Sequence, residues 1–325
     1  MRIHPRSTIF AGIAAAVVMP IFITNRYFMH LLTMALIYII LTLGLNLLVG
    51  ISGQVSLGHA AFFGIGAYTA GILSTKLGLP FIVILPLGIF VPAIMGIFLG
   101  LPAARLKGPY LAMTTLGAGQ IFQLLAVNLR GLTNGPLGIT NIGPFSLFSF
   151  KADTMYKQYI VVLIITIVAM IAFYNIKEGP LGRAWRAIKD SSIASEAMGL
   201  NITWCNVLAF SICSAFAGVA GVLLSYYSTY ISPDMFSLTL SFSLISIIVI
   251  GGRSSLLGTI IGALILTFMP EYLRSIGEWR HLVYSLMLII IVLYSPGGFV
   301  EIINRLKNKV FNNGDLTRKA GDVGE

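Results

Sequence analysis

The sequence predicts an all-α polytopic membrane protein with about ten transmembrane helices, and three observations support this fold class. Hydrophobic residues make up 57% of the 325 residues and charged residues only 10%, whereas a soluble domain of this length needs charge over much of its surface. Residues 27–75 contain no Asp, Glu, Lys or Arg. The net charge of +10 comes from Lys and Arg residues that lie between long apolar runs, so it indicates membrane topology rather than nucleic-acid binding.

Each predicted crossing is a charge-free run, and a run too long for one helix is divided at the Gly, Pro or polar cluster nearest its middle. The predicted crossings are residues 7–24, 27–49, 54–75, 81–103, 110–128, 158–176, 206–229, 237–250, 255–272 and 281–298. The first of them resembles a cleavable secretory signal, because basic residues precede an apolar run. We expect a retained helix instead, since the uncharged stretch is long enough to span and the next crossing follows at once.

A break is predicted between the second and third crossings. The stretch between Arg26 and Lys76 would extend roughly 74 Å as one helix, more than twice the thickness of the hydrocarbon core. Glycine accepts turn geometry, and polar side chains can bond the backbone groups that a break sets free. The residues that supply both here are Gly50, Ser52, Gly53 and Gln54. The eighth crossing is short, which predicts a broken or tilted helix.

The charge distribution predicts the orientation. With the amino terminus in the cytoplasm, roughly two-thirds of the Lys and Arg residues fall on the cytoplasmic side, in agreement with the positive-inside rule. Both termini are then cytoplasmic, residues 1–304 form the transmembrane domain, and residues 305–325 form a charged, flexible cytoplasmic tail. Eight crossings with different internal pairing remain an alternative.

The longest cytoplasmic connection, about residues 177–205, is both charged and amphipathic. It contains the sequence KEGPLGRAWRAIKDSSIASEAMGLN, in which Leu181, Trp185 and Ile188 recur at helical spacing on one face. This pattern predicts a short helix that buries one side.

A second short helix is predicted directly after the first. Asp190 or Ser191 can cap its start, and Gly199 would end it. Such a pair of helices would give a separate cytoplasmic motor a stiff element on which to act. An interfacial helix that anchors the loop to lipid headgroups fits the same pattern.

Small residues follow helical spacing in two segments, residues 52–71 and 214–228, which permits close contact between helices and suggests an old duplication. Polar residues in the crossings either line a path for solute or bond helices together. The candidates for the translocation path or for helix packing are Asn46, Gln54, Ser56, Gly58, His59, Gly64, Gln120, Gly218 and Gly221.

His59 is ionisable and lies inside a predicted crossing, so a proton relay is one candidate role. Its crossing contains no acidic residue, and only the ninth crossing ends near a carboxylate, Glu271. A structural, hydrogen-bonded histidine is therefore the favoured interpretation.

Residues 130–143 are uncharged after Arg130 but too rich in Gly, Asn, Thr and Pro to form a crossing, which predicts an external loop. The loop either receives a partner that delivers solute or is an ordinary connection.

The sequence lacks the motifs of several enzyme classes. It has no Gly-Lys pair, so no phosphate-binding loop is present, and its four histidines are scattered rather than spaced as metal ligands. It also lacks a G-x-S-x-G nucleophile turn. These absences predict a transporter rather than an enzyme, with no metal or cofactor held by this chain. An ion-coupled secondary transporter or channel is an alternative, but it would usually carry acidic residues in the membrane.

The segment LNLLVGISGQVSLGHAAFFGIGAYTAGIL resembles the permease family of branched-chain amino acid ATP-binding-cassette importers, particularly its LivM branch. Further blocks resemble the family in order and approximate spacing. They are GPYLAMTTLGAGQIFQLL followed by LTNGPLGITNI, GPLGRAWRAIKDSSIASEAMGLN with the apolar run after it, and IVIGGRSSLLGTIIGALILTFMPEYLR. Together the blocks cover most of residues 42–274.

The resemblance implies a multi-pass permease subunit of the bacterial inner membrane that moves leucine, isoleucine or valine by alternating access. It implies four kinds of partner: the lipid bilayer, a homologous LivH-like second permease, two cytoplasmic ATPases that bind ATP and Mg, and an extracytoplasmic amino-acid-binding protein. No nucleic-acid partner is implied. Related permeases carry urea, short amides, other amino acids or sugars, so the solute stays open.

The resemblance also places the ATPase-contacting surface on residues 181–200. The positions that match the family pattern are Arg183, Trp185, Arg186, Asp190, Glu196 and Gly199. The signature of the wider importer superfamily begins Glu-Ala-Ala, whereas this chain has Glu196, Ala197 and Met198. The individual contacts are therefore less well defined than the surface.

Overall fold

A computed structural model of the chain describes residues 25–106, 108–147, 150–152 and 154–273, together with residues 277, 279, 283 and 286. The predicted crossings 7–24 and 281–298 and the predicted tail 305–325 lie outside the continuous ranges. The chain divides into two compact units, Met1–Ile245 and Ser246–Glu325.

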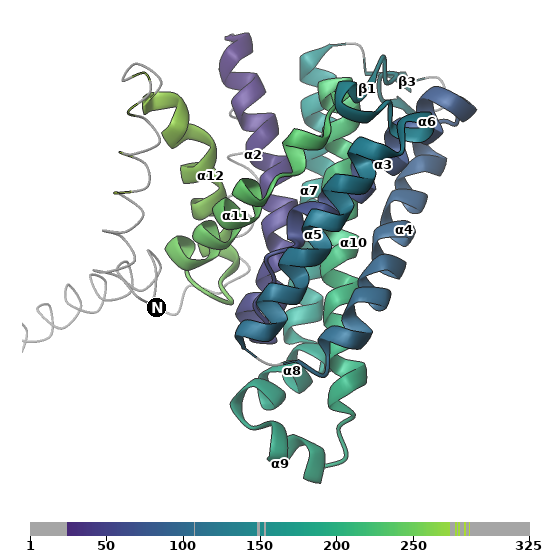
Figure 1. Cartoon of the computed structure of the whole chain (residues 1–325). Helices are drawn as coiled ribbons and strands as arrows, with labels where there is room; N and C mark the ends of the chain where they lie inside the picture. The colour runs from purple at the N-terminus through teal and green to yellow at the C-terminus, as the bar shows by residue number, and fades with distance from the viewer. Residues whose placement is uncertain are drawn as a thin grey trace, which may run out of the picture. The chain divides into compact units, whose positions relative to one another are not determined.

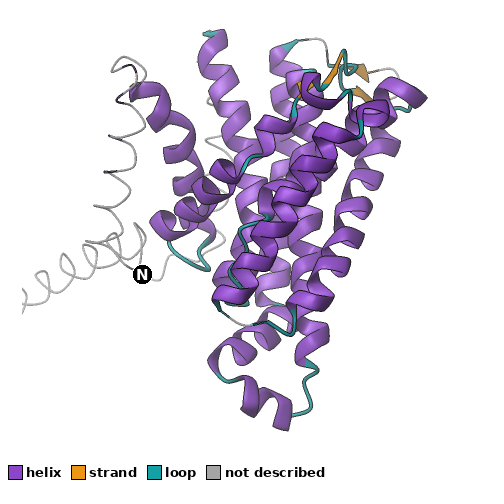
Figure 2. Ribbon diagram, in the orientation of Figure 1, coloured by secondary structure: helices purple, strands orange, loops and turns teal. Residues whose placement is uncertain are grey.

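The described part of the first unit is a bundle of long helices with short strands at one end (Figures 1 and 2). Its helical elements are α2 (Arg26–Leu45), η1 (Asn46–Ile51), α3 (His59–Leu77), α4 (Phe81–Ala103), α5 (Pro109–Asn128), α6 (Arg130–Thr133), η2 (Gly135–Leu137), α7 (Met155–Glu178), α8 (Pro180–Asp190), α9 (Ser192–Ala197), α10 (Ile202–Ser228) and η3 (Pro233–Phe236). Helix α11 (Leu238–Gly251) passes from the first unit into the second, which also contains α12 (Leu256–Tyr272).

Six of the described helical segments are long and apolar enough to cross a membrane. They are Arg26–Ile51, Phe81–Ala103, Pro109–Asn128, Met155–Glu178, Ile202–Ser228 and Pro233–Gly251. Two more helices match predicted crossings: α3 has 19 residues and α12 has 17. The all-α polytopic membrane fold is thus confirmed, while the total of about ten helices and the orientation stay predictions.

The outer surfaces of α4 and α7 consist of large apolar side chains. Phe90, Ile94 and Phe98 of α4 are exposed, as are Ile164 and Val168 of α7. In water such a surface would be unfavourable, but it is what a helix needs on the side that contacts lipid. The exposed apolar sides of these two helices are suited to contact with lipid.

Helix α10 lies at the centre of the first unit, where it packs against α2, α3 and α4. Glycines bring the backbones together. A Cβ atom added to Gly218 would lie 2.1 Å from the Gly88 carbonyl oxygen of α4, and one added to Gly221 would lie 2.2 Å from the Phe63 oxygen of α3. No side chain fits at such a distance. The close helix contact predicted for the two small-residue segments is therefore present between α3 and α10.

The predicted break after the second crossing is present and is longer than expected. Six residues of π-helix, η1, end the second crossing at Ile51, and residues 52–58 are not helical. We call residues 52–58 the break segment. The prediction that the third crossing starts at residue 54 is wrong, because α3 begins only at His59. Hydrogen bonds to Thr115 and Ser241 from distant helices hold the chain here, and sequence periodicity does not report such bonds.

Helix α3 begins inside the bundle rather than at its end. The Nε2 atom of His59 lies 2.8 Å from the carbonyl oxygen of Leu41. Leu41 is about 15 Å along the helix from Ile51, where η1 ends. The break segment therefore runs back into the bundle. Non-helical backbone is tolerated at such a depth because it is surrounded by protein.

Two short structures mark the opposite ends of the first unit (Figure 1). Helices α8 and α9 lie at one end. At the other end, β1 (Ile139–Thr140) pairs antiparallel with β4 (Tyr230–Ile231), and β2 (Ser146–Leu147) pairs with β3 (Phe150–Lys151). The predicted external loop thus lies at the end of the bundle opposite the predicted cytoplasmic connection.

Candidate functional site

Helices α8 and α9 form a compact projection, which we call the α8–α9 hairpin. Pro180 starts α8, where its missing N–H costs nothing. Trp185 is completely buried, and its indole Nε1 donates to the Cys205 carbonyl oxygen at 2.8 Å. Leu181 and Ile188 are partly buried on the same side. The predicted apolar face of α8 is confirmed, and Trp185 fixes the hairpin to the start of α10.

Helix α9 begins and ends as its sequence predicts. The Ser191 hydroxyl accepts from the Ala194 N–H at 3.3 Å, so Ser191 rather than Asp190 is the cap. The helix ends at Ala197, and Gly199 follows with φ +85°, a conformation that favours glycine. Ile193 and Met198 are 82% and 84% exposed at the tip of the hairpin. An exposed apolar tip on a fixed base is suited to contact with another protein.

The structure separates the predicted coupling residues into an anchor and a surface. Trp185 is the anchor. Arg183 is exposed, and its Nη1 donates to the Glu178 carbonyl oxygen at 2.9 Å. Arg186 is half-buried, while Asp190, Glu196 and Gly199 are exposed. The exposed charged residues lie on the same hairpin as the apolar tip.

Lys189 is a residue of the site that the sequence reasoning did not select. Its Nζ donates to the Gly50 carbonyl oxygen at 2.7 Å, and these residues are 139 positions apart in the chain. Gly50 belongs to η1, directly before the break segment. The only sequence signal is a lysine in the last turn of a short helix beside an amphipathic face, and this signal does not identify its partner.

The break segment carries buried polar side chains. Gln54 Nε2 donates to Asn206 Oδ1 of α10 at 2.9 Å and to the Ser52 hydroxyl at 3.1 Å. Ser56 is almost completely buried. Gln54 Oε1 and Ser56 Oγ have no hydrogen-bond partner within the described residues. A buried polar atom without a hydrogen-bond partner destabilises the fold, so Gln54 and Ser56 are candidates for contact with solute.

Backbone contacts hold the start of α3 against α5 and α11. The Leu57 N–H donates to Thr115 Oγ1 at 2.9 Å, and the Ala60 N–H donates to Ser241 Oγ at 3.2 Å. A Cβ atom on Gly58 would lie 2.3 Å from the Thr115 carbonyl oxygen, so only glycine allows this approach. Thr115 and Ser241 were not selected from the sequence, because a hydroxyl in an apolar run is a common feature.

His59 is completely buried and joins three helices. Its Nε2 lies 2.8 Å from the Leu41 oxygen of α2, and its Nδ1 lies 3.3 Å from Cys213 Sγ of α10. If Nε2 carries the proton, it donates to Leu41 and Nδ1 accepts from the thiol. Both ring nitrogens are thus engaged, which supports a structural role.

The remaining candidates are buried in helix contacts, except Gln120. Asn46 is completely buried in η1. Gly64 faces aromatic rings, since a Cβ atom there would lie 2.4 Å from Phe122 and 2.9 Å from Phe236. Gly218 and Gly221 are in the contacts of α10 described above. Gln120 lies on α5 and is half-buried.

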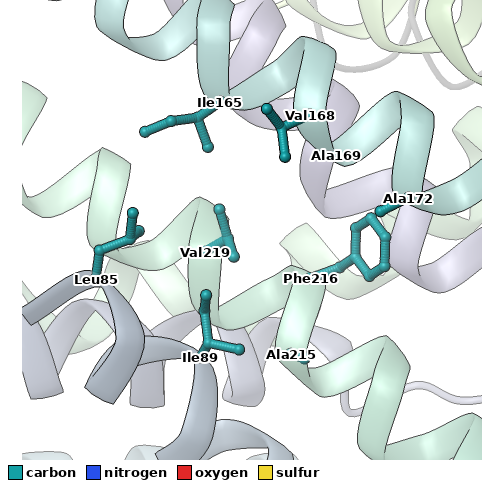
Figure 3. Close-up of a pocket in the computed structure, with 9 residues that line it drawn as sticks. All are labelled: Leu85, Ile89, Ile165, Val168, Ala169, Ala172, Ala215, Phe216 and Val219. Atoms are coloured by element: carbon teal, nitrogen blue, oxygen red, sulfur yellow. The ribbon is translucent and has the colours of Figure 1, made fainter.

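A groove of about 440 Å³ lies between α4, α7 and α10 (Figure 3). Its lining is entirely apolar: Leu85, Ile89, Ile165, Val168, Ala169, Ala172, Ala215, Phe216 and Val219. It contains no candidate residue and offers no group to a charged amino or carboxylate group. The part of the chain that the structure describes also contains no cluster of three or more His, Cys, Asp or Glu side chains that could hold a metal ion.

Comparison with known proteins places these features in a family. Residues 27–293 match the family model described as "Branched-chain amino acid transport system / permease component". The chain is 34% identical to the branched-chain amino acid transport permease LivM of Salmonella typhimurium, over 90% of this chain and 74% of the relative. It is 33% identical to LivM of Escherichia coli, over 88% and 74% respectively.

More distant relatives match over similar lengths. The LivH permease of Salmonella typhimurium is 26% identical over 82% of this chain and 92% of the relative. The ribose import permease RbsC of Haemophilus influenzae is 23% identical over 89% and 91%. No solved structure matches the chain.

Proposed function

Because the chain belongs to the family of permease components of branched-chain amino acid transport systems, we propose that it is one membrane subunit of an ATP-driven importer of leucine, isoleucine and valine. In this proposal two cytoplasmic ATPases act on the α8–α9 hairpin. A homologous second permease completes the solute path in the bacterial inner membrane, and an extracytoplasmic binding protein supplies the amino acid. ATP and Mg are bound by the partner ATPases rather than by this chain.

The α8–α9 hairpin is the observation that carries the proposal. It projects from one end of the first unit, its base is fixed by the bond between Trp185 and Cys205, and its tip exposes Ile193 and Met198. A rigid base with an exposed apolar tip allows a force applied by a second protein to reach the membrane helices. The basic surface of α8 and exposed Glu196 add charges that can select a partner.

The described residues give little support to ion coupling. His59 lies in the membrane bundle, but both of its ring nitrogens are engaged. A transporter driven by an ion gradient usually carries an acidic or basic side chain that faces its path. A permease moved by external ATPases needs no such group.

Alternating access follows from the same arrangement. Closure of the ATPases would displace the hairpin, and the helices around the break segment and the Gly218–Gly221 contact would rearrange to open the path on one side at a time. In this proposal Gln54 Oε1 and Ser56 Oγ, which have no partner within the described residues, offer hydrogen-bond acceptors to solute, and Ser56 also offers a donor. The ribose permease relative makes a sugar the competing solute to test.

Gentle purification and vesicle uptake test the proposal. We expect a second permease and two ATPases to co-purify with the chain. Reconstituted vesicles with the binding protein should take up radiolabelled leucine when ATP is inside, with the proton gradient collapsed by an ionophore. Excess isoleucine or valine should compete, and ribose should not. Uptake that needs the proton gradient but not ATP would contradict the proposal.

Substitutions on the hairpin separate its role from membrane insertion. Arg186→Ala and Glu196→Ala should abolish leucine uptake while the chain still inserts in the membrane at its normal level. The reason is that both side chains lie on the α8–α9 hairpin and outside the membrane-spanning helices, with Glu196 exposed and Arg186 half-buried. Retained uptake in both variants would count against the hairpin as the ATPase contact.

A further inference from the structure

We infer that Lys189 is a positioning residue that ties the α8–α9 hairpin to the break segment, so that movement of the hairpin moves residues 52–58. This inference rests on the proposed function, because it names the side chain through which the cytoplasmic contact reaches the membrane helices. Four sets of contacts support it.

The first is the bond between Lys189 and Gly50. Lys189 lies in the last turn of α8, and its Nζ donates to the Gly50 carbonyl oxygen at 2.7 Å. Gly50 lies near the end of η1, where the last carbonyl oxygens of a helix accept no hydrogen bond from within the helix. A helix C-terminus carries partial negative charge, so an ammonium group at this place is favourable. The bond is charge-assisted and therefore stronger than a neutral one.

The second is the fit of the lysine stem over Gly53. Gly53 has φ +76°, which disfavours any other residue. A Cβ atom there would lie 3.0 Å from Lys189 Cγ and 3.2 Å from its Cδ. Gly53 is thus the residue whose lack of a side chain leaves room for Lys189. The lysine stem thus lies over Gly53 of the break segment, and its ammonium group bonds Gly50 just before that segment.

The third is a parallel connection through α10. The hairpin is bonded to α10 by Trp185 and the Cys205 oxygen, at 2.8 Å. The next residue, Asn206, accepts from Gln54 Nε2 of the break segment at 2.9 Å. The hairpin, the start of α10 and the break segment therefore form one hydrogen-bonded unit. Within this unit, the Lys189 side chain bonds the hairpin directly to η1.

The fourth is the connection at the other end of the break segment. Leu57 N–H bonds Thr115 of α5, and Ala60 N–H bonds Ser241 of α11. A shift at Gly50 is therefore transmitted along a short, non-helical chain to the start of α3 and to two further helices. Packed elements with discrete arrangements carry such shifts over long distances.

The test measures ATP hydrolysis and leucine uptake together in the reconstituted complex of permeases, ATPases and binding protein. Lys189→Met keeps the apolar stem and removes the ammonium group. We expect leucine transported per ATP hydrolysed to fall at least about tenfold, the scale of one lost charge-assisted bond, while hydrolysis stays within about twofold of wild type. Lys189→Arg should restore most of the ratio.

Gly53→Ala provides a second variant that leaves Lys189 in place. Its new methyl group crowds the lysine stem and strains the backbone of the break segment at φ +76°, so the ratio should fall in the same direction. Lys76→Met is the matched control, because Lys76 also donates to a backbone carbonyl oxygen, that of Gly131 in α6, but at the opposite end of the bundle. Its ratio should equal that of wild type.

The outcomes separate this inference from the proposed function. A wild-type ratio in Lys189→Met overturns the inference and leaves the proposed function standing. A parallel fall of hydrolysis and uptake, or loss of the assembled complex in both Lys189 variants, assigns a purely structural role and also overturns it. Absence of ATPases from the wild-type complex is the distinct result that removes the proposed function.

Discussion

Single side chains fix this bundle through bonds between residues far apart in the sequence. His59 is the clearest case, since one imidazole contacts the Leu41 carbonyl oxygen of α2 and the Cys213 thiol of α10 from its own helix α3. Polar contacts between membrane helices are modest individually, but each specifies one register of the helices it joins. A structural role for His59 is predicted from the sequence because its crossing contains no acidic residue, and the geometry supports this interpretation.

Trp185 gives a prediction at the residue scale. Trp185→Phe keeps most of the buried ring and removes the donor to the Cys205 oxygen, so the free energy of unfolding should fall by about 1 kcal/mol. The measurement is the thermal unfolding midpoint of the detergent-purified chain. Trp204→Phe is the control, because Trp204 is 57% exposed and should give a midpoint close to wild type. Equal midpoints for both variants would refute the anchor role of Trp185.

The roles of individual residues in the site were the feature that could least be predicted from the sequence. Trp185 was selected correctly as a member of an apolar face, because helical spacing reports burial. Lys189, Thr115 and Ser241 were missed, because each acts through a partner more than 50 positions away. Neither periodicity nor charge counting contains the pairing of such distant residues.

At the scale of elements, α10 depends on the absence of side chains. Its glycines meet the backbones of α3 and α4, and in lipid such contact relies on close packing rather than on the hydrophobic effect. Small residues at three and four spacing predicted this contact from the sequence. The partner α4 was not predicted, because its contacting glycines, such as Gly88, lie in a run that reads only as strongly apolar.

Gly218→Ala tests this contact. The added methyl group would lie 2.1 Å from the Gly88 oxygen, so the helices must separate, and we expect a loss of about 1–3 kcal/mol in stability. The measurement is the fraction of purified chain that stays monodisperse after heating. Gly117→Ala is the matched control in α5, since its Cβ would meet nothing within 4 Å. A Gly218 variant as heat-resistant as the control would show that the contact is not tight.

Element boundaries followed composition wherever a helix is continuous. The crossing predicted at 81–103 coincides with α4, and the one predicted at 110–128 differs from α5 by one residue at its start. The predicted start of α3 was wrong because tertiary hydrogen bonds, and not only local turn residues, decide how long the break segment is. Continuous helices are set by local apolar character, whereas interruptions depend on partners elsewhere.

At the scale of the whole molecule, the first unit has two chemically different ends. One carries the α8–α9 hairpin with its basic residues, and the other carries the strand pair of β1 and β4. The positive-inside rule assigns the hairpin end to the cytoplasm. The structure places the two regions at opposite ends, and the orientation itself stays a prediction.

Cysteine labelling measures the orientation. In a chain whose half-buried Cys205 is replaced by serine, Leu137→Cys and Met198→Cys place single exposed thiols at opposite ends, since these positions are 80% and 84% exposed. A membrane-impermeant maleimide added to intact spheroplasts should label position 137 only. Position 198 should react in inside-out vesicles. Labelling of position 198 from outside would reverse the orientation and remove the hairpin from the cytoplasm.

The π-helical stretch η1, directly before the break segment, gives the bundle a mechanical property. A π-turn contains one residue more than an α-turn, so this crossing carries a spare residue where it meets the break segment. Conversion of that turn to α geometry would advance the chain beyond it by one residue, which is about 1.5 Å of travel and about 100° of rotation. Gln54 would then turn away from Asn206 and lose the bond to it, whereas the hydrogen bonds of α2 would stay in place.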